Sequence, residues 1–312
     1  MNVFLWHVHG SWTTAFVQGS HRYLVPVLPN RGPDGRGRAR TWDWPPSVVE
    51  VSPEEAARAE VDVVVLQRPE ELAGLAMRWL GRRRPGRDVP AVYVEHNAPQ
   101  GRISEMRHHA ADRPDLLLAH VTHFNDLFWD AGNTPTRVIE HGIVDPGEQY
   151  TGELPRAVVA INEPGRRGRV TDTDLLGRLG REVPIDLFGM ATEALGGIED
   201  PPQHLLHEEM ARRRLYLHPI RWTSLGLTLI EAMHLGMPVV ALATTEAPEA
   251  VPPEAGVVST SVDRLIEACR HLIREPEEAL LKGKAARGAA LERYGLGRFL
   301  TDWDRVLKEV TA

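Results

Sequence analysis

The sequence predicts an α/β protein of two doubly wound, Rossmann-like domains that face a central cleft. Short apolar runs rich in Val, Ile and Leu alternate with longer amphipathic segments, which is typical of parallel strands joined by crossover helices. The alternation stops at a polar segment rich in Gly and Pro, residues 142–156, and restarts beyond it. With 312 residues, the chain is long enough for two domains that each bury a core.

We place the first domain at residues 1–146, a hinge at 147–156 and the second domain at 157–295. Residues 296–312 show helical spacing and are expected to form a last helix. No internal repeat of solenoid period is present, so a repeat architecture is not expected.

Five strands are predicted in each half of the chain. Those of the first half are the apolar runs at residues 3–8, 61–67, 91–96, 116–121 and 136–141. Those of the second half are at 157–162, 185–189, 215–219, 238–243 and 256–259. One helix has a clear start signal, because Ser52 can cap it, Pro53 suits its first position and Glu55 can reach back to the cap.

Composition excludes several classes of partner. The formal net charge of -7 and the pI near 6.1 give no general reason to expect binding to nucleic acid or to an acidic membrane. The single cysteine, Cys269, rules out an intrachain disulfide and favours a cytoplasmic location. No apolar stretch reaches the roughly 18 residues of a membrane span, and the start lacks a basic leader. We therefore expect no transmembrane segment and no signal peptide.

Three stretches differ from the rest of the chain in charge or composition. The basic runs "GRRRPGR" (81–87) and "GRRGR" (165–169) can meet phosphates, although a solvated loop is favoured for the first. The stretch "NRGPDGRGR" (30–38) looks like a long flexible loop, either a lid or acceptor-binding segment or irregular surface.

Polar residues follow three predicted strands of the first domain. Ligands of a parallel α/β sheet bind beyond the carboxyl ends of its strands. After the first strand, Gly10 permits close backbone approach and Ser11 can cap a helix. The residues expected to converge on one rim are His9, Gly10, Arg68, His96 and Asn97. The alternative is that they are caps and satisfied polar groups of the sheet edge.

In the second domain, the stretch from Trp222 to Ala250 predicts a helix that opens on a ligand. Ser224 is placed as its cap, and Gly226 lets a ligand approach its first turn. The free N–H groups of such a helix start suit a diphosphate. Glu231 lies on an otherwise apolar helix, where a carboxylate needs hydrogen-bond donors such as the vicinal hydroxyls of a ribose. The alternative is that Glu231 lies on a solvated side of the helix or holds a neighbouring backbone turn.

The segment "LGLTLIEAMHLGMPVVA" (225–241) resembles the donor-site motif of the retaining glycosyltransferases of family 4, which have the two-domain B-type (GT-B) fold. Weaker similarity covers most of the chain and includes the segments "VIEHGIVD" (138–145), "GRRGRVTDTDLL" (165–176), "DLFG" (186–189) and "LYLHP" (215–219). Arg167 and Gly168 stand at the family's Lys-Gly positions. His96 is similar in position to a histidine that contacts the transferred sugar.

The resemblance implies transfer of a hexose from a UDP- or GDP-linked sugar to an acceptor hydroxyl with retention, without metal or another cofactor. The nucleotide sugar is then a co-substrate, and the first domain binds an unknown acceptor, whether glycan, lipid or small molecule. The last helix crosses back onto that domain. The catalytic positions are His96, Arg167 and Thr223. The donor-binding positions are Gly10, Ser11, Asn162, Arg166, Gly189, Ser224, Leu225, Gly226, Leu227, Glu231 and Glu249, and the acceptor-side positions are His9, Arg68 and Asn97.

Two positions depart from the family pattern. Thr223 stands where the family has the first of two glutamates, of which Glu231 is the second. Asn162 stands where the family usually has an arginine, a charge that Arg166, Arg167 or Arg169 can supply. Glu249 has the offset of the family's acid in the following turn, without the paired glycines.

Three other functions stay open. A metal-dependent hydrolase is suggested by the pair His7 and His9, because two histidines two residues apart on a strand can share a metal. A non-catalytic binding partner of the same fold would explain Thr223. A nucleotide-sugar epimerase on a similar fold is the third. Trp42 and Trp44 are either an aromatic platform for an acceptor or anchors of their loop.

Overall fold

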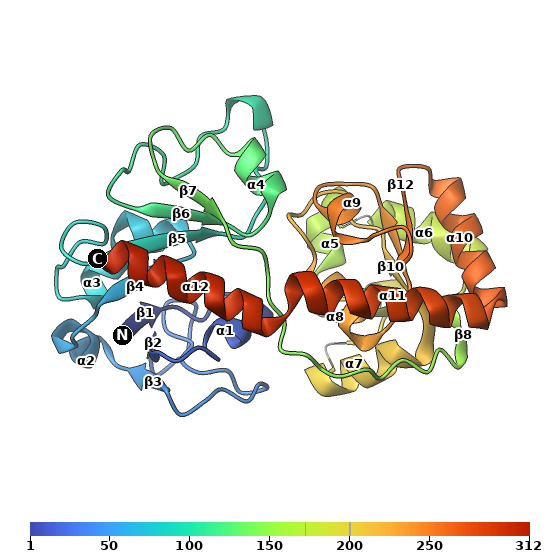
Figure 1. Cartoon of the computed structure of the whole chain (residues 1–312), viewed down its shortest axis with the longest axis horizontal. Coiled ribbons are helices and arrows are strands. Elements are labelled where there is room, and N and C mark those ends of the chain that lie inside the picture. Colours follow the sequence, from blue (N-terminus) through green and yellow to red (C-terminus); the bar gives the residue numbers. More distant parts are fainter. Residues whose placement is uncertain (172, 200) are drawn as a thin grey trace. The chain divides into compact units, whose positions relative to one another are not determined.

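The structure is a computed structural model that describes residues 1–171, 173–199 and 201–312. It confirms the predicted α/β class, with one parallel sheet of seven strands and one of five (Figure 1). The chain divides into two compact units. The first contains residues Met1–Val144 and Leu296–Ala312, and the second contains Asp145–Gly295.

The expected hinge belongs to the second unit. Strand β8 starts inside it, at Leu154, and the backbone N–H groups of Gln149 and Tyr150 both donate to the carbonyl of Leu235. The first unit ends at Val144, whereas the sequence placed its end at residue 146. This stretch thus makes backbone hydrogen bonds within the second unit.

The sheet of the first unit has the order β3-β2-β1-β4-β5-β6-β7, and all its pairs are parallel. Its strands are β1 (Asn2–Leu5), β2 (Arg22–Pro26), β3 (Val48–Val51), β4 (Val63–Leu66), β5 (Ala91–Glu95), β6 (Leu117–His120) and β7 (Thr136–Val138). Strand order reverses between β1 and β4. The carboxyl ends of these two strands therefore form the switch point where ligands of such sheets bind.

Two of these strands were not predicted. β2 reads "RYLVP" and β3 reads "VVEV"; each is short and flanked by charged residues or proline. It is pairing that makes them strands, because β2 pairs with β1 and β3 pairs with β2.

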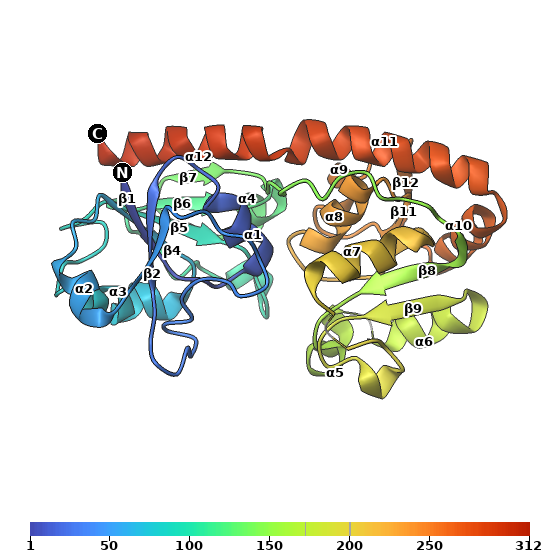
Figure 2. The same cartoon turned by 90° about the horizontal axis from the view of Figure 1, so that it is seen from below.

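Helices cover both faces of this sheet (Figures 1 and 2). They are α1 (Gly10–Phe16), α2 (Pro53–Arg58), a π-helical turn η1 (Glu71–Leu75) that leads into α3 (Ala76–Trp79), the 3-10 turn η2 (Ile103–Glu105), α4 (His123–Phe128) and α12 (Leu296–Thr311). α2 and α3 share one core cluster with the sheet, whereas α12 contacts α1 and β4. The capping box predicted for α2 is confirmed, since Ser52 and Glu55 bond each other's backbone N–H groups at 3.3 and 2.8 Å.

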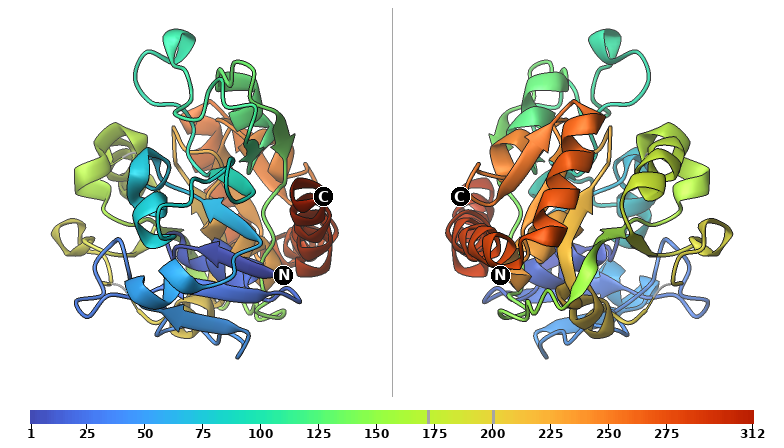
Figure 3. Two further views of the ribbon diagram at one scale, coloured as in Figure 1. Left: turned by 90° about the vertical axis from the view of Figure 1, so that its left-hand side faces the viewer. Right: turned by 90° about the vertical axis from the view of Figure 1, so that its right-hand side faces the viewer.

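Helix α12 is part of the first unit. Its Trp303 packs edge-on against Trp12 and Phe16 of α1, with ring centroids 5.7 and 5.1 Å apart. Gly142 lies so close to Phe299 that any side chain there would overlap the ring. Thr311 and Met1 are in contact, so both ends of the described chain lie on this unit (Figures 2 and 3).

The sheet of the second unit has the order β12-β11-β10-β8-β9 and is also parallel. Its strands are β8 (Leu154–Ala160), β9 (Ile185–Phe188), β10 (Arg213–His218), β11 (Val239–Leu242) and β12 (Gly256–Ser259). The switch point falls between β8 and β10. Ligands of doubly wound sheets bind at such a switch point, so the residues that follow β8 and β10 are candidates for a ligand site.

The helices of this unit are α5 (Pro164–Arg167), η3 (Gly168–Val170), α6 (Thr173–Glu182), η4 (Glu193–Leu195), α7 (Gln203–Arg212), α8 (Leu227–Leu235), α9 (Ala247–Ala250), α10 (Val262–Arg274) and α11 (Pro276–Tyr294). α6 and α10 share one core cluster with the sheet. α8 contacts α7 and α11. Gly236 ends α8 with a positive φ of 88°, as the sequence predicted. In the described part of the chain, no helix has the length and apolar character needed to span a membrane.

Candidate functional site

Three histidine rings and one tryptophan meet in the first unit. The rings of His9 and His96 are 4.0 Å apart between centroids, and Trp12 meets His96 edge-on at 5.0 Å. The ring of His141 lies 6.5 Å from His96 and nearly parallel to it. These residues follow β1, β5 and β7, so the sheet brings their side chains together across its carboxyl edge.

Gln67, the residue after β4, fixes the orientation of His96. Its Oε1 lies 3.0 Å from Nε2 of His96, while its Nε2 donates to the carbonyl of Trp6 at 2.8 Å. Because the amide oxygen can only accept, the proton of a neutral His96 is assigned to Nε2. Nδ1 is then an acceptor, suited to a hydroxyl donor such as that of a sugar.

All three histidines are held neutral. Burial, followed by the charge of Arg36, lowers the pKa of His9 to about 4. Burial also lowers the pKa of His96 well below its ordinary value, and lowers the pKa of His141 to about 3. At neutral pH the cluster therefore offers hydrogen bonds and no positive charge.

The loop after β5 is anchored by buried hydrogen bonds of Glu95. Oε2 of Glu95 lies 2.9 Å from Nε2 of His108, and its Oε1 accepts from the backbone N–H of Asn97 at 2.6 Å. Trp129 donates to the carbonyl of Asn97 at 2.8 Å. The side chain of Asn97 is exposed, so its backbone, and not its amide, helps to position His96.

The predicted convergence on one rim holds for only part of the set. His9 and His96 meet, and Gly10 lies beside Trp42, whose Nε1 would be 3.7 Å from a side chain added there. Arg68 instead pairs with buried Glu71 at 2.7 Å and with Asp34 at 3.4 Å. The position of Arg68 at a strand end was a weak signal for a ligand site, because Glu71, three residues further along the chain, neutralises its charge.

The predicted Ser11 cap is wrong. α1 starts at Gly10, one residue earlier than such a cap allows, and its cap position is His9, which makes no side-chain capping bond. The first helical turn already includes Gly10, so it begins before the serine. Ser11 lies within the first turn instead.

The histidine pair of the metal hypothesis does not form a shared site. Nδ1 of His7 lies 3.2 Å from the carbonyl of Gly37 and its ring meets Trp44, whereas His9 meets His96. Among residues 1–171, 173–199 and 201–312, no group of three or more His, Cys, Asp or Glu is arranged to hold a metal ion. Trp44 donates to Thr14 at 2.8 Å and is buried, which makes it an anchor of its loop.

In the second unit, the loop after β10 opens helix α8 at Gly226. A side chain at Gly226 would lie 2.6 Å from Cε1 of buried His218, so only glycine lets the backbone pass at this point. The predicted Ser224 cap is wrong: the helix starts at Leu227, and Gly226 is its cap position. Ser224 and Leu225 belong to this loop and are buried, whereas Leu227 is half-buried.

Glu231 is buried and bonded to helix α7. Its Oε2 accepts from Nε2 of Gln203 at 3.0 Å and lies 3.5 Å from Nε2 of His207. The sequence predicted that a carboxylate on this apolar helix needs hydrogen-bond donors, and Gln203 of α7 is one. Nε2 of Gln203 also donates to Nε2 of His207 at 2.7 Å. Gln203 and His207 gave no signal in the sequence, because they lie 28 and 24 residues away on another helix.

The segment after β8 carries Arg167. Arg166 and Arg169 are neutralised by Glu163 and by Asp174, the latter at 3.2 Å. Arg167 is half-buried, and within the described parts of the chain its side chain has no hydrogen-bond or ion-pair partner. Burial, followed by the charge of Arg166, lowers its pKa from the ordinary value.

This segment is tied to the loop that leads into α8. The carbonyl of Val170 accepts from the backbone N–H groups of Arg221 and Trp222 at 3.2 and 3.3 Å. Arg221 also bonds Asp174 at 2.7 Å. Arg167 and the start of α8 are therefore held in one framework at the same end of the sheet.

Asn162 and Gly189 lie at the ends of β8 and β9. Oδ1 of Asn162 accepts from the backbone N–H of Met190 at 3.0 Å. Gly189 has a φ of 132° and approaches the carbonyl of Ile161 too closely for any side chain. Asn162 thus holds the turn after β9.

The acid buried in the turn after β11 is Glu246. It is 2% exposed, and its Oε1 lies 3.3 Å from Arg293 of α11. Glu249, which the sequence singled out, is exposed in the first turn of α9. Thr223 is half-buried in the loop before α8.

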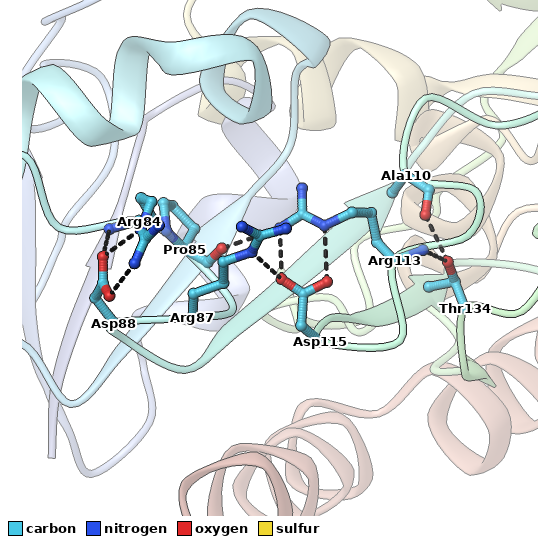
Figure 4. A network of polar contacts seen from close by, with 8 residues as sticks. All are labelled: Arg84, Pro85, Arg87, Asp88, Ala110, Arg113, Asp115 and Thr134. Atoms are coloured by element: carbon cyan, nitrogen blue, oxygen red, sulfur yellow. Dashed lines mark hydrogen bonds and ion pairs between the residues drawn. The ribbon is translucent and has the colours of Figure 1, made fainter.

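Part of the first basic run is neutralised within the first unit (Figure 4). Arg84 pairs with Asp88 at 2.8 Å, and Arg87 and Arg113 share Asp115 at 3.7 and 2.7 Å. Two of the four arginines in the run therefore already have a carboxylate partner, which weakens their attraction for a phosphate.

Residues 187–275 match the family described as "Glycosyl transferases group 1". No curated protein matches the chain in sequence. Sucrose-phosphate synthase from Thermosynechococcus elongatus has the same fold, with 12% identity and a TM-score of 0.75 over 99% of both chains. Anabaena HepE in complex with UDP-glucose follows with 14% identity and a TM-score of 0.72 over 99% of this chain and 100% of its own. A glycosyltransferase from Rickettsia africae shows 12% identity and a TM-score of 0.68 over 99% and 98%.

Residues 187–275 of the second unit are therefore similar to a group 1 glycosyltransferase domain, and the chain has the GT-B fold of these structures. The resemblance expected from residues 225–241 is confirmed for the fold and for this domain, since the matched segment includes them.

Proposed function

We propose that the protein is a retaining, metal-independent glycosyltransferase that moves a hexose from a UDP-linked sugar to an acceptor hydroxyl. The group 1 match over residues 187–275 supports the reaction class. A shared fold with HepE, which was solved with UDP-glucose, favours UDP over GDP as the donor base. The one buried cysteine, Cys269, has no disulfide partner, which is consistent with a cytoplasmic enzyme.

The observation that carries the proposal is the framework of Arg167 and α8. Charge develops on the departing diphosphate as the bond to the sugar breaks. The guanidinium of Arg167, which has no carboxylate partner among the residues that the structure describes, and the N–H groups of a nine-residue helix meet such charge without a metal. The bonds from Val170 to Arg221 and Trp222 fix these two donors on the same side of the sheet.

Other residues take supporting roles in the proposal. Glu231 accepts from the ribose hydroxyls, and its bond from Gln203 helps to hold its carboxylate in place. His96 binds a hydroxyl of the transferred sugar through Nδ1. Thr223 offers a neutral hydroxyl where related enzymes have an acid, so the sugar is bound there by a weaker, uncharged contact.

The first experiment is a thermal-stability panel with UDP, GDP, ADP and TDP and their glucose conjugates. A ligand present at a hundredfold its Kd stabilises the folded protein by about 2.7 kcal/mol. We expect UDP to raise Tm of the wild type and of the exposed control Glu254→Gln, and to lose most of this effect in Arg167→Met and Glu231→Ala.

Three outcomes contradict parts of the proposal. If GDP alone raises Tm, the donor base is guanine instead of uracil. Nucleotide binding without any transfer or hydrolysis of the donor favours a non-catalytic binding protein of the same fold. A panel without any rise rejects the nucleotide-sugar function.

A further inference from the structure

A strongly basic pocket lies in the first unit, next to the histidine cluster. It has a volume of about 380 Å³, and four arginines line it together with His7 and Asn30. These are Arg31, Arg36, Arg38 and Arg40, and we call this site the arginine pocket. In the described chain, no acidic residue belongs to its lining. It is built by the stretch "NRGPDGRGR" and the residues that follow, between β2 and β3.

Two of the arginines hold this loop in shape. Arg31 forms a bidentate pair with Glu50 of β3, at 2.8 and 3.1 Å. The guanidinium of Arg38 donates to the carbonyls of Trp44, Pro45 and Val48 at 2.5, 3.0 and 2.5 Å. The loop that the sequence suggested to be flexible is therefore anchored along its length.

The other two arginines carry charge that nothing in the described structure neutralises. Arg36 and Arg40 are exposed, and among residues 1–171, 173–199 and 201–312 neither guanidinium has a hydrogen-bond or ion-pair partner. A loop held by several bonds that presents two free guanidinium groups is pre-organised for an anion.

The arginine pocket adjoins the place where the sugar is proposed to bind. His7 lines the pocket, and His9, two residues further on, meets His96. Arg36 is near enough to His7 and His9 for its charge to add to the effect of burial in lowering the pKa of both. An anion in the pocket therefore lies beside the reacting end of the first unit.

We propose that the arginine pocket binds a phosphate group carried by the acceptor. This inference rests on the proposed glycosyl transfer, since it names the class of acceptor. Guanidinium groups bind phosphate oxygens through paired N–H donors, and two of them match the charge of a phosphate monoester. The diphosphate of the donor has its own cationic framework in the second unit, around Arg167 and α8. The phosphate belongs either to a soluble sugar phosphate or to a lipid phosphate.

The test is calorimetric titration of the full chain with inorganic phosphate and with glucose 1-phosphate. Arg36→Ala and Arg40→Ala are each expected to weaken binding about tenfold, because each removes one charge-assisted contact. Arg58→Ala, an exposed arginine of α2, is the matched control and should bind like the wild type. Neither pocket arginine anchors the loop, so Tm should stay unchanged. Absent phosphate binding, or equal binding by all four proteins, overturns the proposal.

Two further arms identify the source of the phosphate and separate this inference from the proposed function. Arg36-dependent binding to phosphatidylcholine vesicles that contain phosphatidic acid, with weak binding of glucose 1-phosphate, assigns a lipid phosphate; the reverse assigns a soluble one. The affinity for UDP should be the same in Arg36→Ala and the wild type. A tenfold loss of UDP affinity would make the pocket part of the donor site and overturn the inference. If UDP does not bind the wild type at all, the proposed function fails, whereas the phosphate titration still reports on the pocket.

Discussion

Oε1 of Gln67 lies 3.0 Å from Nε2 of His96, and the same amide donates to the carbonyl of Trp6. We predict that Gln67→Leu lowers kcat/KM for sugar transfer about tenfold or more, because His96 loses the bond that sets its tautomer. The affinity for UDP, measured by calorimetry, should change little. An unaltered kcat/KM would show that His96 does not depend on this bond.

The variant Gln67→Glu gives a sharper measurement of the same contact. Its carboxylate keeps the shape of the side chain and accepts from His96, but its negative charge favours the protonated imidazole. The pKa of His96 should rise, and activity that needs the neutral ring should be lost at a higher pH than in the wild type. A pH profile of kcat/KM that coincides with that of the wild type contradicts this account.

Gly226 has no room for a side chain against His218. Gly226→Ala is expected to destabilise the protein by about 1–3 kcal/mol through overpacking, and to weaken UDP binding because the start of α8 is displaced. Its φ of -69° suits alanine, so backbone strain does not contribute. In a Gly226→Ala/His218→Ala double variant the clash is absent, and urea unfolding should give a stability close to that of His218→Ala alone. Strict additivity of the two single effects would argue against the clash.

The buried pair of Glu246 and Arg293 predicts unequal single variants. Arg293→Met leaves a carboxylate that is 2% exposed without its cation and should cost about 3 kcal/mol in urea unfolding. Glu246→Gln removes the charge and should cost less. Combining both changes should recover part of the loss of Arg293→Met. If the double variant is the least stable of the three, the pair is not the source of the effect.

His141 predicts a loss of stability in acid. Burial lowers its pKa to about 3 in the folded protein, whereas the unfolded chain binds its proton near pH 6.5. The unfolded state therefore binds more protons between these values, so stability present above pH 6.5 falls progressively towards pH 3. His141→Phe cannot take up a proton, and its Tm should decline less over this window than that of the wild type. Parallel curves of Tm against pH would contradict the assignment.

Local patterns in the sequence predicted those parts of the fold that depend on neighbouring residues. Ser52 and Glu55 lie three residues apart, and Gly236 directly follows its helix, so each signal is complete within one turn. β4 and β5 are continuous apolar runs and were predicted for the same reason. Ser224 was placed wrongly because serine favours a cap in general, while contact between Gly226 and His218 decides where α8 begins.

The candidate site was harder to predict from the sequence, because the residues that contact one another there come from distant parts of the chain. Gln67 reads as the last residue of an apolar strand and His141 as part of another, and only the order of the sheet places them beside His96. The same holds for Glu231 and its partners on α7. Strand ends showed where to look in the first unit, whereas Arg68 shows that a polar residue at such an end can serve the structure alone.

The first unit is discontinuous in sequence, and this affects the order in which the chain can fold as it is synthesised. Residues 145–295 leave the ribosome as one unbroken stretch and can complete their core before residues 296–312 are made. Trp12 and Phe16 must wait for Phe299 and Trp303, which are made about 280 residues later. Until then the first unit has an uncovered aromatic face. A ribosome stalled shortly before residue 296 would thus hold a finished second unit beside an unfinished first one, a natural binding target for chaperones.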